Sequence, residues 1–197
     1  RSEGAVIAAP VQPMAAQIVV PVRPQHLIAR KVREGARIPC PDMGPAHIHL
    51  MAGIAEGPAA QDAFLRSLEW ATSQAPGQSF LIEPLNPRDM PGYFLNSFDL
   101  AAGIIAEIGA PNLWLQFDVY HAHMITADVA GAWADHGALA RHIQIGRIPD
   151  RADPVGGEFD FPAFFDALDA AGYDGWVSGE YHPAGATGDG LAWMAKA

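Results

Sequence analysis

The strongest constraint on the fold of this chain is a regular alternation of short apolar runs with longer segments of helical character. The apolar runs are typical of buried strands, and they cover residues 47–53, 79–86, 113–121, 141–149 and 175–183. A segment with the spacing of a helix follows each run, at 57–75, 96–110, 126–138, 160–173 and 188–197. This alternation predicts a parallel sheet whose strands are joined by helical crossovers.

Individual residues indicate where the helices begin, where they end and how they pack. Asn96 or Ser97 is a suitable N-cap, Gly109 a suitable C-cap, and Pro162 is expected in the first turn of its helix. Three aromatic residues on predicted helix faces are expected to pack in the core: Trp70, Trp133 and Phe164.

Two parallel architectures compete for this pattern. A nucleotide-binding doubly wound sheet is disfavoured, because no apolar run is followed by a GxGxxG turn or a P-loop. A TIM barrel uses eight strand–helix units in about 250 residues and carries its active site at the carboxyl ends of the strands. Five units are recognisable here. We therefore expect an α/β fold, a TIM (β/α)8-type barrel that is incomplete in this chain.

The composition changes sharply near residue 45. Residues 1–45 lack Phe, Trp and Tyr and have a net charge of +3. Residues 46–197 have a net charge of −13, which gives the whole chain its net charge of −10. We interpret residues 1–45 as an atypical Pro- and Arg-rich segment, and residues 46–197 as the C-terminal part of a barrel. The acidic balance argues against binding to nucleic acid, which normally requires a basic surface.

The uncharged stretch at residues 5–22 has three interpretations. Pro10, Pro13 and Pro21 would interrupt a membrane-spanning helix, but an N-terminal targeting segment is one reading. Short strands at residues 5–9 and 17–22 are a second reading. The third is that residues 1–45 come from a shifted reading frame or a fragment. The single cysteine, Cys40, excludes an internal disulfide, and we expect a cytoplasmic protein without a membrane segment.

Polar side chains recur near the ends of the predicted strands. Glu83, Asp118, Gln144 and Glu180 each end an otherwise apolar run, and His49 lies in the remaining one. Burying a lone carboxylate is costly unless it is paired or binds a cation. In a barrel these strand ends converge on one rim. Three carboxylates and an amide oxygen form a site suited to Mg²⁺ or Mn²⁺.

Each of these residues has a structural explanation when it is considered alone. A glutamate at a strand end is commonly a solvated cap, a lone Gln144 a hydrogen-bonding core residue, and His49 a satisfied buried histidine. His121, three residues after Asp118, could simply contact that carboxylate. Their coincidence on successive strands favours a functional site.

Five stretches share one resemblance. They are HIHLMAG, LIEPLNPRDMPGYFL, LWLQFDVYHAH, RHIQIGRIPDRADPVGGEFDF and GWVSGEYHPAGATGDGLAWM. They resemble the hydroxypyruvate isomerase family, within the xylose isomerase-like TIM barrel superfamily, over about residues 46–197. EPLNPRDMPGYFL and HIQIG with the following PDR and GGE are the most specific segments. Residues 1–45 show no such resemblance.

The resemblance implies a role for each matching residue. It places the metal on Glu83, Asp118, Gln144 and Glu180, and it makes Glu83 and Glu180 the acid/base pair. It places His49, His121, Arg151 and Glu158 in or beside the substrate pocket. The chain departs from the family where RHEP is usual, since it reads Arg-Ala-Asp-Pro at 151–154, and at Arg147, where a small or neutral residue is usual.

The resemblance implies an isomerase that interconverts hydroxypyruvate and 2-hydroxy-3-oxopropanoate with Mg²⁺ or Mn²⁺ as cofactor. The binding partner it implies is the substrate, a small hydroxy-keto acid. A homo-oligomer is one possible assembly. A 2-oxo-tetronate isomerase and another keto-sugar isomerase or epimerase are alternatives within the superfamily. Endonuclease activity is disfavoured by the net charge of −10. An inactive partial barrel or an interaction module is the alternative outside enzymes, because unpaired sheet edges invite association.

Overall fold

The computed structural model describes residues 46–186 and residue 191. The strands are β1 (His47–His49), β2 (Ser79–Ile82), β3 (Leu113–Asp118), β4 (Ala140–Ile145) and β5 (Trp176–Gly179). The helices are α1 (Pro58–Gln74), α2 (Phe98–Ile108), α3 (Val119–Thr126), α4 (Val129–His136) and α5 (Phe161–Ala170), with a 3-10 turn at Gly137–Leu139. The predicted strands at 5–9 and 17–22 lie outside the described residues, as does the predicted helix at 188–197 except for residue 191.

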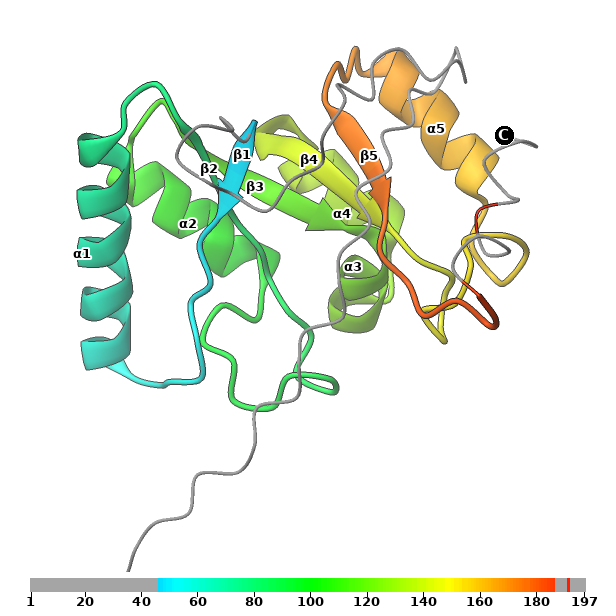
Figure 1. Ribbon diagram of the computed structural model, residues 1–197, viewed down its shortest axis with the longest axis horizontal. Helices are drawn as coiled ribbons and strands as arrows, with labels where there is room; N and C mark the ends of the chain where they lie inside the picture. The colour runs from blue at the N-terminus through cyan, green and yellow to red at the C-terminus, as the bar shows by residue number, and fades with distance from the viewer. Residues whose placement is uncertain (1–45, 187–190, 192–197) are drawn as a thin grey trace, which may run out of the picture.

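The five strands form one parallel sheet in the order β1-β2-β3-β4-β5, which is also their order in the sequence. The sheet curls into a half-barrel, and the helices lie along its outer side (Figure 1). This confirms the predicted α/β barrel-type fold. The described residues contain five strands, of which the first four are each followed by a helix.

The hydrophobic core lies between the outer face of the sheet and the helices. Side chains alternate between the two faces of a strand, so Leu115 and Phe117 of β3 point outward into the core. The Phe117 ring lies 5.1 Å from the ring of Phe98 on α2 and 5.3 Å from that of Trp133 on α4, measured between centroids. Gln116 and Asp118 consequently point to the inner face of the curled sheet.

Several predicted helix ends are confirmed. Ser97 caps α2, since its Oγ accepts a hydrogen bond from the backbone N–H of Leu100 at 3.1 Å. Gly109 ends the same helix in the left-handed conformation, with φ of 61°. Pro162 lies in the first turn of α5, as expected.

The prediction of a strand over residues 113–121 was too long, and it missed a helix. β3 ends at Asp118, whose carboxylate accepts from the backbone N–H groups of Tyr120 and His121 and so begins α3. The predicted helix at 126–138 begins later than expected: Thr126 ends α3, and Asp128 caps α4 through the N–H of Gly131. The apolar character of Val119 and Tyr120 concealed the capping role of Asp118.

The expectation that Trp70 packs in the core was wrong, since 67% of this residue is exposed. Successive residues of a helix are about 100° apart, so Trp70 lies about 200° around α1 from the buried Leu68. Trp133 and Phe164 do pack against the core, as predicted.

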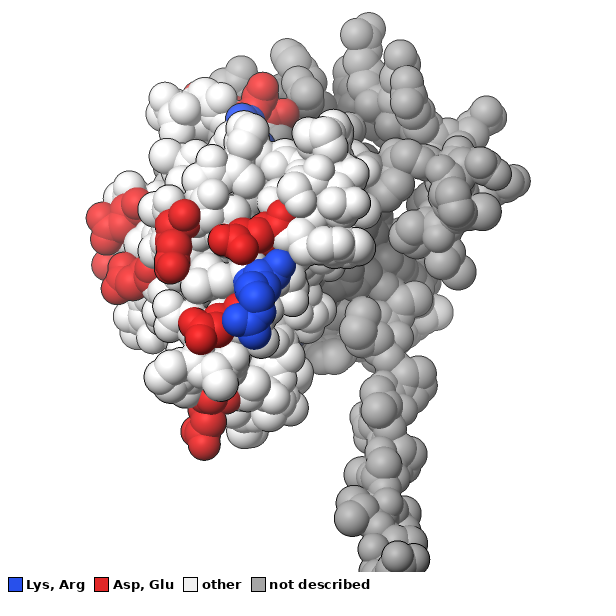
Figure 2. Space-filling model, turned by 90° about the vertical axis from the view of Figure 1, so that its left-hand side faces the viewer, with Lys and Arg blue, Asp and Glu red and all other residues white. Residues whose placement is uncertain are grey.

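The surface around α1 carries more acidic than basic side chains (Figure 2). In the part of the chain that the structure describes, no helix combines the length and the apolar character needed to span a bilayer.

Replacing Phe117 by Ala should lower the free energy of unfolding by about 3–5 kcal/mol, because it leaves a cavity between β3 and the helices. Chemical denaturation of the purified chain measures this loss. Trp70→Ala is the matched control and should change stability by less than about 0.5 kcal/mol. A larger loss for Trp70→Ala than for Phe117→Ala would contradict this description of the core.

Candidate active site

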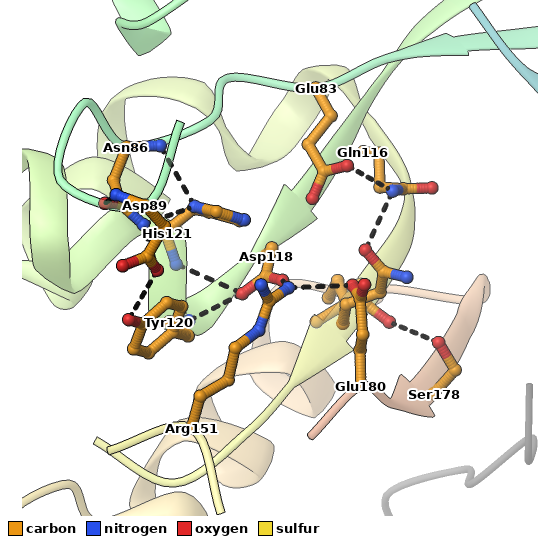
Figure 3. A network of polar contacts seen from close by, with 12 residues as sticks. Glu83, Asn86, Asp89, Gln116, Asp118, Tyr120, His121, Arg151, Ser178 and Glu180 are labelled. Atoms are coloured by element: carbon orange, nitrogen blue, oxygen red, sulfur yellow. Dashed lines mark hydrogen bonds and ion pairs between the residues drawn. The ribbon is translucent and has the colours of Figure 1, made fainter. Parts of the chain in front are cut away.

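Four polar side chains meet at the carboxyl edge of the sheet (Figure 3). Glu83 directly follows β2, Asp118 ends β3 and Glu180 directly follows β5. Gln144 lies in β4, directly opposite Asp118 in the strand register. Because all the strands are parallel, their carboxyl ends share one edge. Glu83, Asp118 and Gln144 are buried, whereas Glu180 is partly exposed.

The amide of Gln116 links two of these residues. Its Nε2 donates to Oε2 of Glu83 at 2.7 Å (Figure 3). The same nitrogen donates to Oε1 of Gln144 at 2.8 Å. Gln116 is itself buried. Three neighbouring strands are therefore connected through one side chain at the level of the site.

Asp118 uses its two carboxylate oxygens for different purposes. Oδ1 accepts from the backbone N–H groups of Tyr120 and His121, at 2.7 and 3.1 Å. Oδ2 lies 3.0 Å from Nη2 of Arg151. The carboxylate is thus held at the end of β3 by the start of α3 on one side and by a guanidinium on the other.

Arg151 brings positive charge to this acidic edge. The same Nη2 lies 3.0 Å from Asp118 and 3.1 Å from Oε2 of Glu180, so one nitrogen bridges two strands. Arg151 has φ of 53°, a left-handed conformation that is unfavourable for a residue with a side chain. Two backbone hydrogen bonds hold it there. The N–H of Arg151 donates to the carbonyl of Arg147 at 2.8 Å, and the carbonyl of Arg151 accepts from the N–H of His182 at 2.7 Å.

The end of β5 approaches β4 closely at Gly146. A Cβ at this position would lie 2.7 Å from the carbonyl oxygen of Glu180, closer than such atoms pack. The backbone N–H of Glu180 donates to the carbonyl of Ile145 at 2.9 Å. Glycine at position 146 therefore keeps Glu180 against the edge of the site.

His121 is held as a neutral hydrogen-bond donor. Its Nδ1 accepts from the backbone N–H of Asn86 at 3.0 Å and lies 2.8 Å from the side-chain nitrogen of Asn86. A nitrogen that accepts a hydrogen bond does not carry the proton, so Nε2 of the neutral ring does. Burial, reinforced by the charge of Arg151, lowers the pKa of His121 to about 4.

A second layer of hydrogen bonds supports this part of the site. The hydroxyl of Tyr120 donates to Oδ2 of Asp89 at 2.6 Å, and the amide of Asn86 donates to the same oxygen at 3.1 Å. The guanidinium of Arg151 lies 5.0 Å from the centre of the Tyr120 ring. The loop after β2 is thereby tied to α3.

Burial raises the pKa of both buried acids of the cluster, Glu83 and Asp118. Burial raises the pKa of Glu83 well above its ordinary value, and the negative charges of Asp118 and Glu180 raise it further. Burial also raises the pKa of Asp118, although Arg151 opposes this effect. His49 lies 3.7 Å from Glu83, and burial lowers its pKa to about 4, so it is neutral at pH 7. The excess of carboxylates therefore calls for additional positive charge.

The site contains polar atoms that fit a cation or a substrate. Oε1 of Glu83, Nε2 of His49 and Nε of Arg151 are buried and have no hydrogen-bond partner among the described residues. Glu83, Asp118 and His121 each offer a ligand atom, and these atoms lie within 4.8 Å of one another. Carboxylate and amide oxygens suit a hard divalent ion.

Most of the predicted site residues come together at this edge. Glu83, Asp118, Gln144 and Glu180 lie there with His49, His121 and Arg151. Glu158 is exposed on the loop between β4 and α5, and no hydrogen bond or ion pair among the described residues joins it to the cluster. Arg147 pairs with Asp150, and no hydrogen bond or ion pair among the described residues joins its side chain to the cluster.

Sequence reasoning missed several residues that shape the site: Asn86, Asp89, Gln116 and Tyr120. One signal was present. Gln116 lies two residues before Asp118 in an otherwise apolar run, and residues two apart in a strand share a face. The other three lie in the loop after β2 and in α3, where the sequence has no periodicity that would bring them together.

Residues 38–197 match the model of the family described as Xylose isomerase-like TIM barrel. The chain belongs to this family. The match includes every residue of the sheet and of the polar cluster at its carboxyl edge.

Similar proteins support this placement. A 2-oxo-tetronate isomerase of Cupriavidus necator is 42% identical over 158 residues, which cover 77% of this chain and 61% of that protein. The hydroxypyruvate isomerase of Escherichia coli is 34% identical over 58% of this chain and 44% of its own length. A crystal structure titled AP endonuclease, family 2, from Brucella melitensis is 38% identical with a TM-score of 0.72, covering 77% of this chain and 60% of that one. The chain spans about three fifths of the length of the Cupriavidus necator and Brucella melitensis proteins and less than half of the Escherichia coli protein.

The buried histidine below the site should make the protein less stable in acid. Burial, with His47 and His49 nearby, lowers the pKa of His142 from 6.5 to about 4, and Nε2 lies 2.8 Å from the Ser178 hydroxyl. Between pH 6.5 and 4 the unfolded chain binds more protons at this residue, so stability falls as the pH falls.

His142→Asn should therefore reduce the loss of stability between pH 7 and pH 5 by about 2 kcal/mol relative to the wild type. Urea denaturation at both pH values, with EDTA present, measures the difference. The pKa of His142, followed by NMR titration of its ring protons, should lie well below 6. Equal acid sensitivity of the variant and the wild type would show that His142 is not the group responsible.

Proposed function

We propose that this chain is a metal-dependent isomerase that moves a carbonyl group between neighbouring carbons of a small 2-oxo, 3-hydroxy acid. The observation that carries the proposal is the convergence of Glu83, Asp118, Gln144 and Glu180 at one edge of the sheet, with Arg151 between two of the carboxylates. The names of the relatives support an isomerase of this type.

A divalent cation such as Mg²⁺ or Mn²⁺ would be held by Glu83, Asp118, Gln144 and Glu180, and it would stabilise negative charge on the substrate's carbonyl and hydroxyl oxygens. Oε1 of Glu83 suits this role, because it is buried without a partner among the described residues. His121 is less suited as a ligand, since its Nδ1 already accepts from Asn86 and its Nε2 carries the proton. Nε2 of His121 is instead suited to donate to a substrate oxygen.

Two glutamates move the proton in this mechanism. With hydroxypyruvate, one of Glu83 and Glu180 removes a proton from C3, and the electron pair of that C–H bond forms the C2=C3 bond of an enediolate. The other glutamate returns a proton to C2, and the hydroxyl proton on O3 moves to O2, which leaves an aldehyde at C3. The product is 2-hydroxy-3-oxopropanoate. The two residues follow β2 and β5, strands that are not neighbours, so they can approach the substrate from different sides.

Arg151 is the candidate for the substrate's carboxylate. Nη2 pairs with Asp118 and Glu180, but Nε is buried without a hydrogen-bond partner in the described residues. A guanidinium can bind a carboxylate through two parallel N–H groups, which a lysine ammonium cannot. Arg151 can thus pair with the carboxylates of the site through Nη2 and donate to the carboxylate of the substrate through Nε.

Two substrates share the chemistry that this site supports. Hydroxypyruvate and 2-oxo-tetronate each contain a 2-oxo, 3-hydroxy acid unit, and 2-oxo-tetronate has one more carbon. Hydroxypyruvate is our first choice. The 42% identity to a 2-oxo-tetronate isomerase makes the longer acid the second candidate. Comparing kcat/KM for the two acids separates them.

An endonuclease is disfavoured, although one similar structure carries that title. The chain has a net charge of −10, and the α1 face is predominantly acidic (Figure 2). Such a surface repels the phosphate backbone of DNA. A barrel module without activity is the remaining alternative, and the turnover assay distinguishes it.

Glu83→Gln and Glu180→Gln should each lower kcat for hydroxypyruvate with Mn²⁺ by about 10²- to 10⁴-fold, because each removes a group that transfers a proton. Detection of the aldehyde product by coupled reduction measures turnover. Glu107→Gln is the matched control and should retain kcat within about threefold, since Glu107 is an exposed residue of α2 and has no assigned role in the site. Equal turnover in the wild type and both glutamine variants, or no turnover in the wild type, argues against an isomerase.

Arg151→Lys should raise KM for hydroxypyruvate about tenfold or more, because the lysine cannot provide paired N–H donors to a carboxylate. Steady-state kinetics at saturating Mn²⁺ measures the change. Arg147→Lys, on the same loop but paired with Asp150, should leave KM within about twofold. If both lysine variants had the wild-type KM, another residue would have to bind the carboxylate.

A further inference from the structure

Gln116 occupies the centre of the polar inner face, on the middle strand of the sheet. β3 has β2 on one side and β4 on the other, and the Gln116 amide reaches both. Nε2 lies 2.7 Å from Glu83 Oε2 and 2.8 Å from Gln144 Oε1. An amide nitrogen has two hydrogens, so both are used in these two bonds.

The first consequence concerns the two oxygens of Glu83. Gln116 holds Oε2, whereas Oε1 is buried with no partner among the described residues. A carboxylate that is free to rotate could present either oxygen. The hydrogen bond from Gln116 removes this freedom and leaves Oε1 as the oxygen available to a cation or substrate.

The second consequence concerns the amide of Gln144. The oxygen and nitrogen ends of a glutamine side chain have similar shapes but opposite hydrogen-bonding properties. The nitrogen of Gln116 requires an acceptor, so Oε1 of Gln144 faces it, and the amino group of Gln144 is turned away. The same contact keeps the amide oxygen beside the carboxylate of Glu83, where a cation would need it.

Gln116 also lacks the flexibility of a surface residue. It is buried, as are both of its acceptors, and its neighbours Leu115 and Phe117 are packed in the core on the opposite face of β3. A buried donor holds its acceptors in position before a cation binds, so those side chains lose little conformational freedom on binding. Such supporting residues therefore affect metal affinity.

We propose that Gln116 is a positioning residue that sets the affinity of the site for a divalent cation by orienting Glu83 and Gln144. The residue touches neither the cation nor the substrate. This inference rests on the proposed function, because it requires that Glu83 and Gln144 are ligands.

The test is Mn²⁺ binding to the full 197-residue chain, measured by titration calorimetry and by the EPR signal of free Mn²⁺ without any substrate. Gln116→Met keeps the length of the side chain and removes both donors, and it should weaken Mn²⁺ binding about tenfold to a hundredfold. Gln116→Asn keeps an amide that is one methylene too short to reach both acceptors, and it should also weaken binding. It serves as the second variant if the methionine variant does not fold.

Asn112→Leu is the matched control, because Asn112 is an amide donor that directly precedes the same strand, at the end opposite to the site. Its Nδ2 donates to the carbonyls of Thr72, Ala75 and Gln78, at 3.0 to 3.3 Å, and to no residue of the site. Loss of this amide should lower the melting temperature and leave the Mn²⁺ affinity within about twofold. If Gln116 contributed to stability alone, Gln116→Met would behave like Asn112→Leu: its melting temperature would fall and its Mn²⁺ affinity would stay within about twofold of the wild type.

A double-variant cycle shows whether Gln116 acts through Gln144. Gln144→Met should weaken Mn²⁺ binding, and adding Gln116→Met should cost less than it does in the wild type, because one of its two acceptors is gone. Independent, multiplicative losses would overturn the positioning role, as would wild-type affinity in Gln116→Met and Gln116→Asn. A wild-type chain that binds no Mn²⁺ would overturn the metal-dependent function as well, so the two failures are distinguishable.

Discussion

The alternation of side chains along β3 fixes both the hydrophobic core and the polar cluster. Leu115 and Phe117 face the helices and supply the centre of the core, while Gln116 and Asp118 face the inside of the curled sheet. A shift of one residue in this strand would place the carboxylate in the core and the phenylalanine in the site. Core packing and site geometry are therefore determined by the same register, and a fault in one would appear in the other.

A second constraint follows from placing three carboxylates at one edge of a sheet. Burial, and then the negative charges of Asp118 and Glu180, raise the pKa of Glu83, and Arg151 opposes only part of this shift while it bridges Asp118 and Glu180. The arginine adopts a left-handed backbone conformation to reach this position, and its backbone hydrogen bonds hold it there. The left-handed backbone of Arg151 is thus retained at a place where its guanidinium balances the charge of two carboxylates. The same excess of negative charge is the physical basis for expecting a metal ion.

Much of the fold could be predicted because its signals are local. The apolar runs and helical spacings identified all five described strands, and Ser97, Gly109 and Pro162 marked helix ends correctly. Asp118 shows where this reasoning failed: a carboxylate that follows an apolar strand and precedes apolar residues gives no local sign that it caps a new helix. The prediction that Trp70 packs in the core was wrong for a related reason, since the hydrophobicity of a residue does not say which side of a helix it occupies.

At the site, the chemical groups that end the strands could be read directly from the sequence: Glu83, Asp118, Gln144 and Glu180. Their meeting at one edge could be predicted too, because parallel strands bring their carboxyl ends together whatever their detailed packing. The orientation of these groups, in contrast, depends on tertiary contacts. The contacts of Gln116 with Glu83 and Gln144 span 33 and 28 residues, and Asn86 contacts His121 across 35. Hydrogen bonds over such separations depend on the curl and register of the sheet, which no short stretch of sequence encodes.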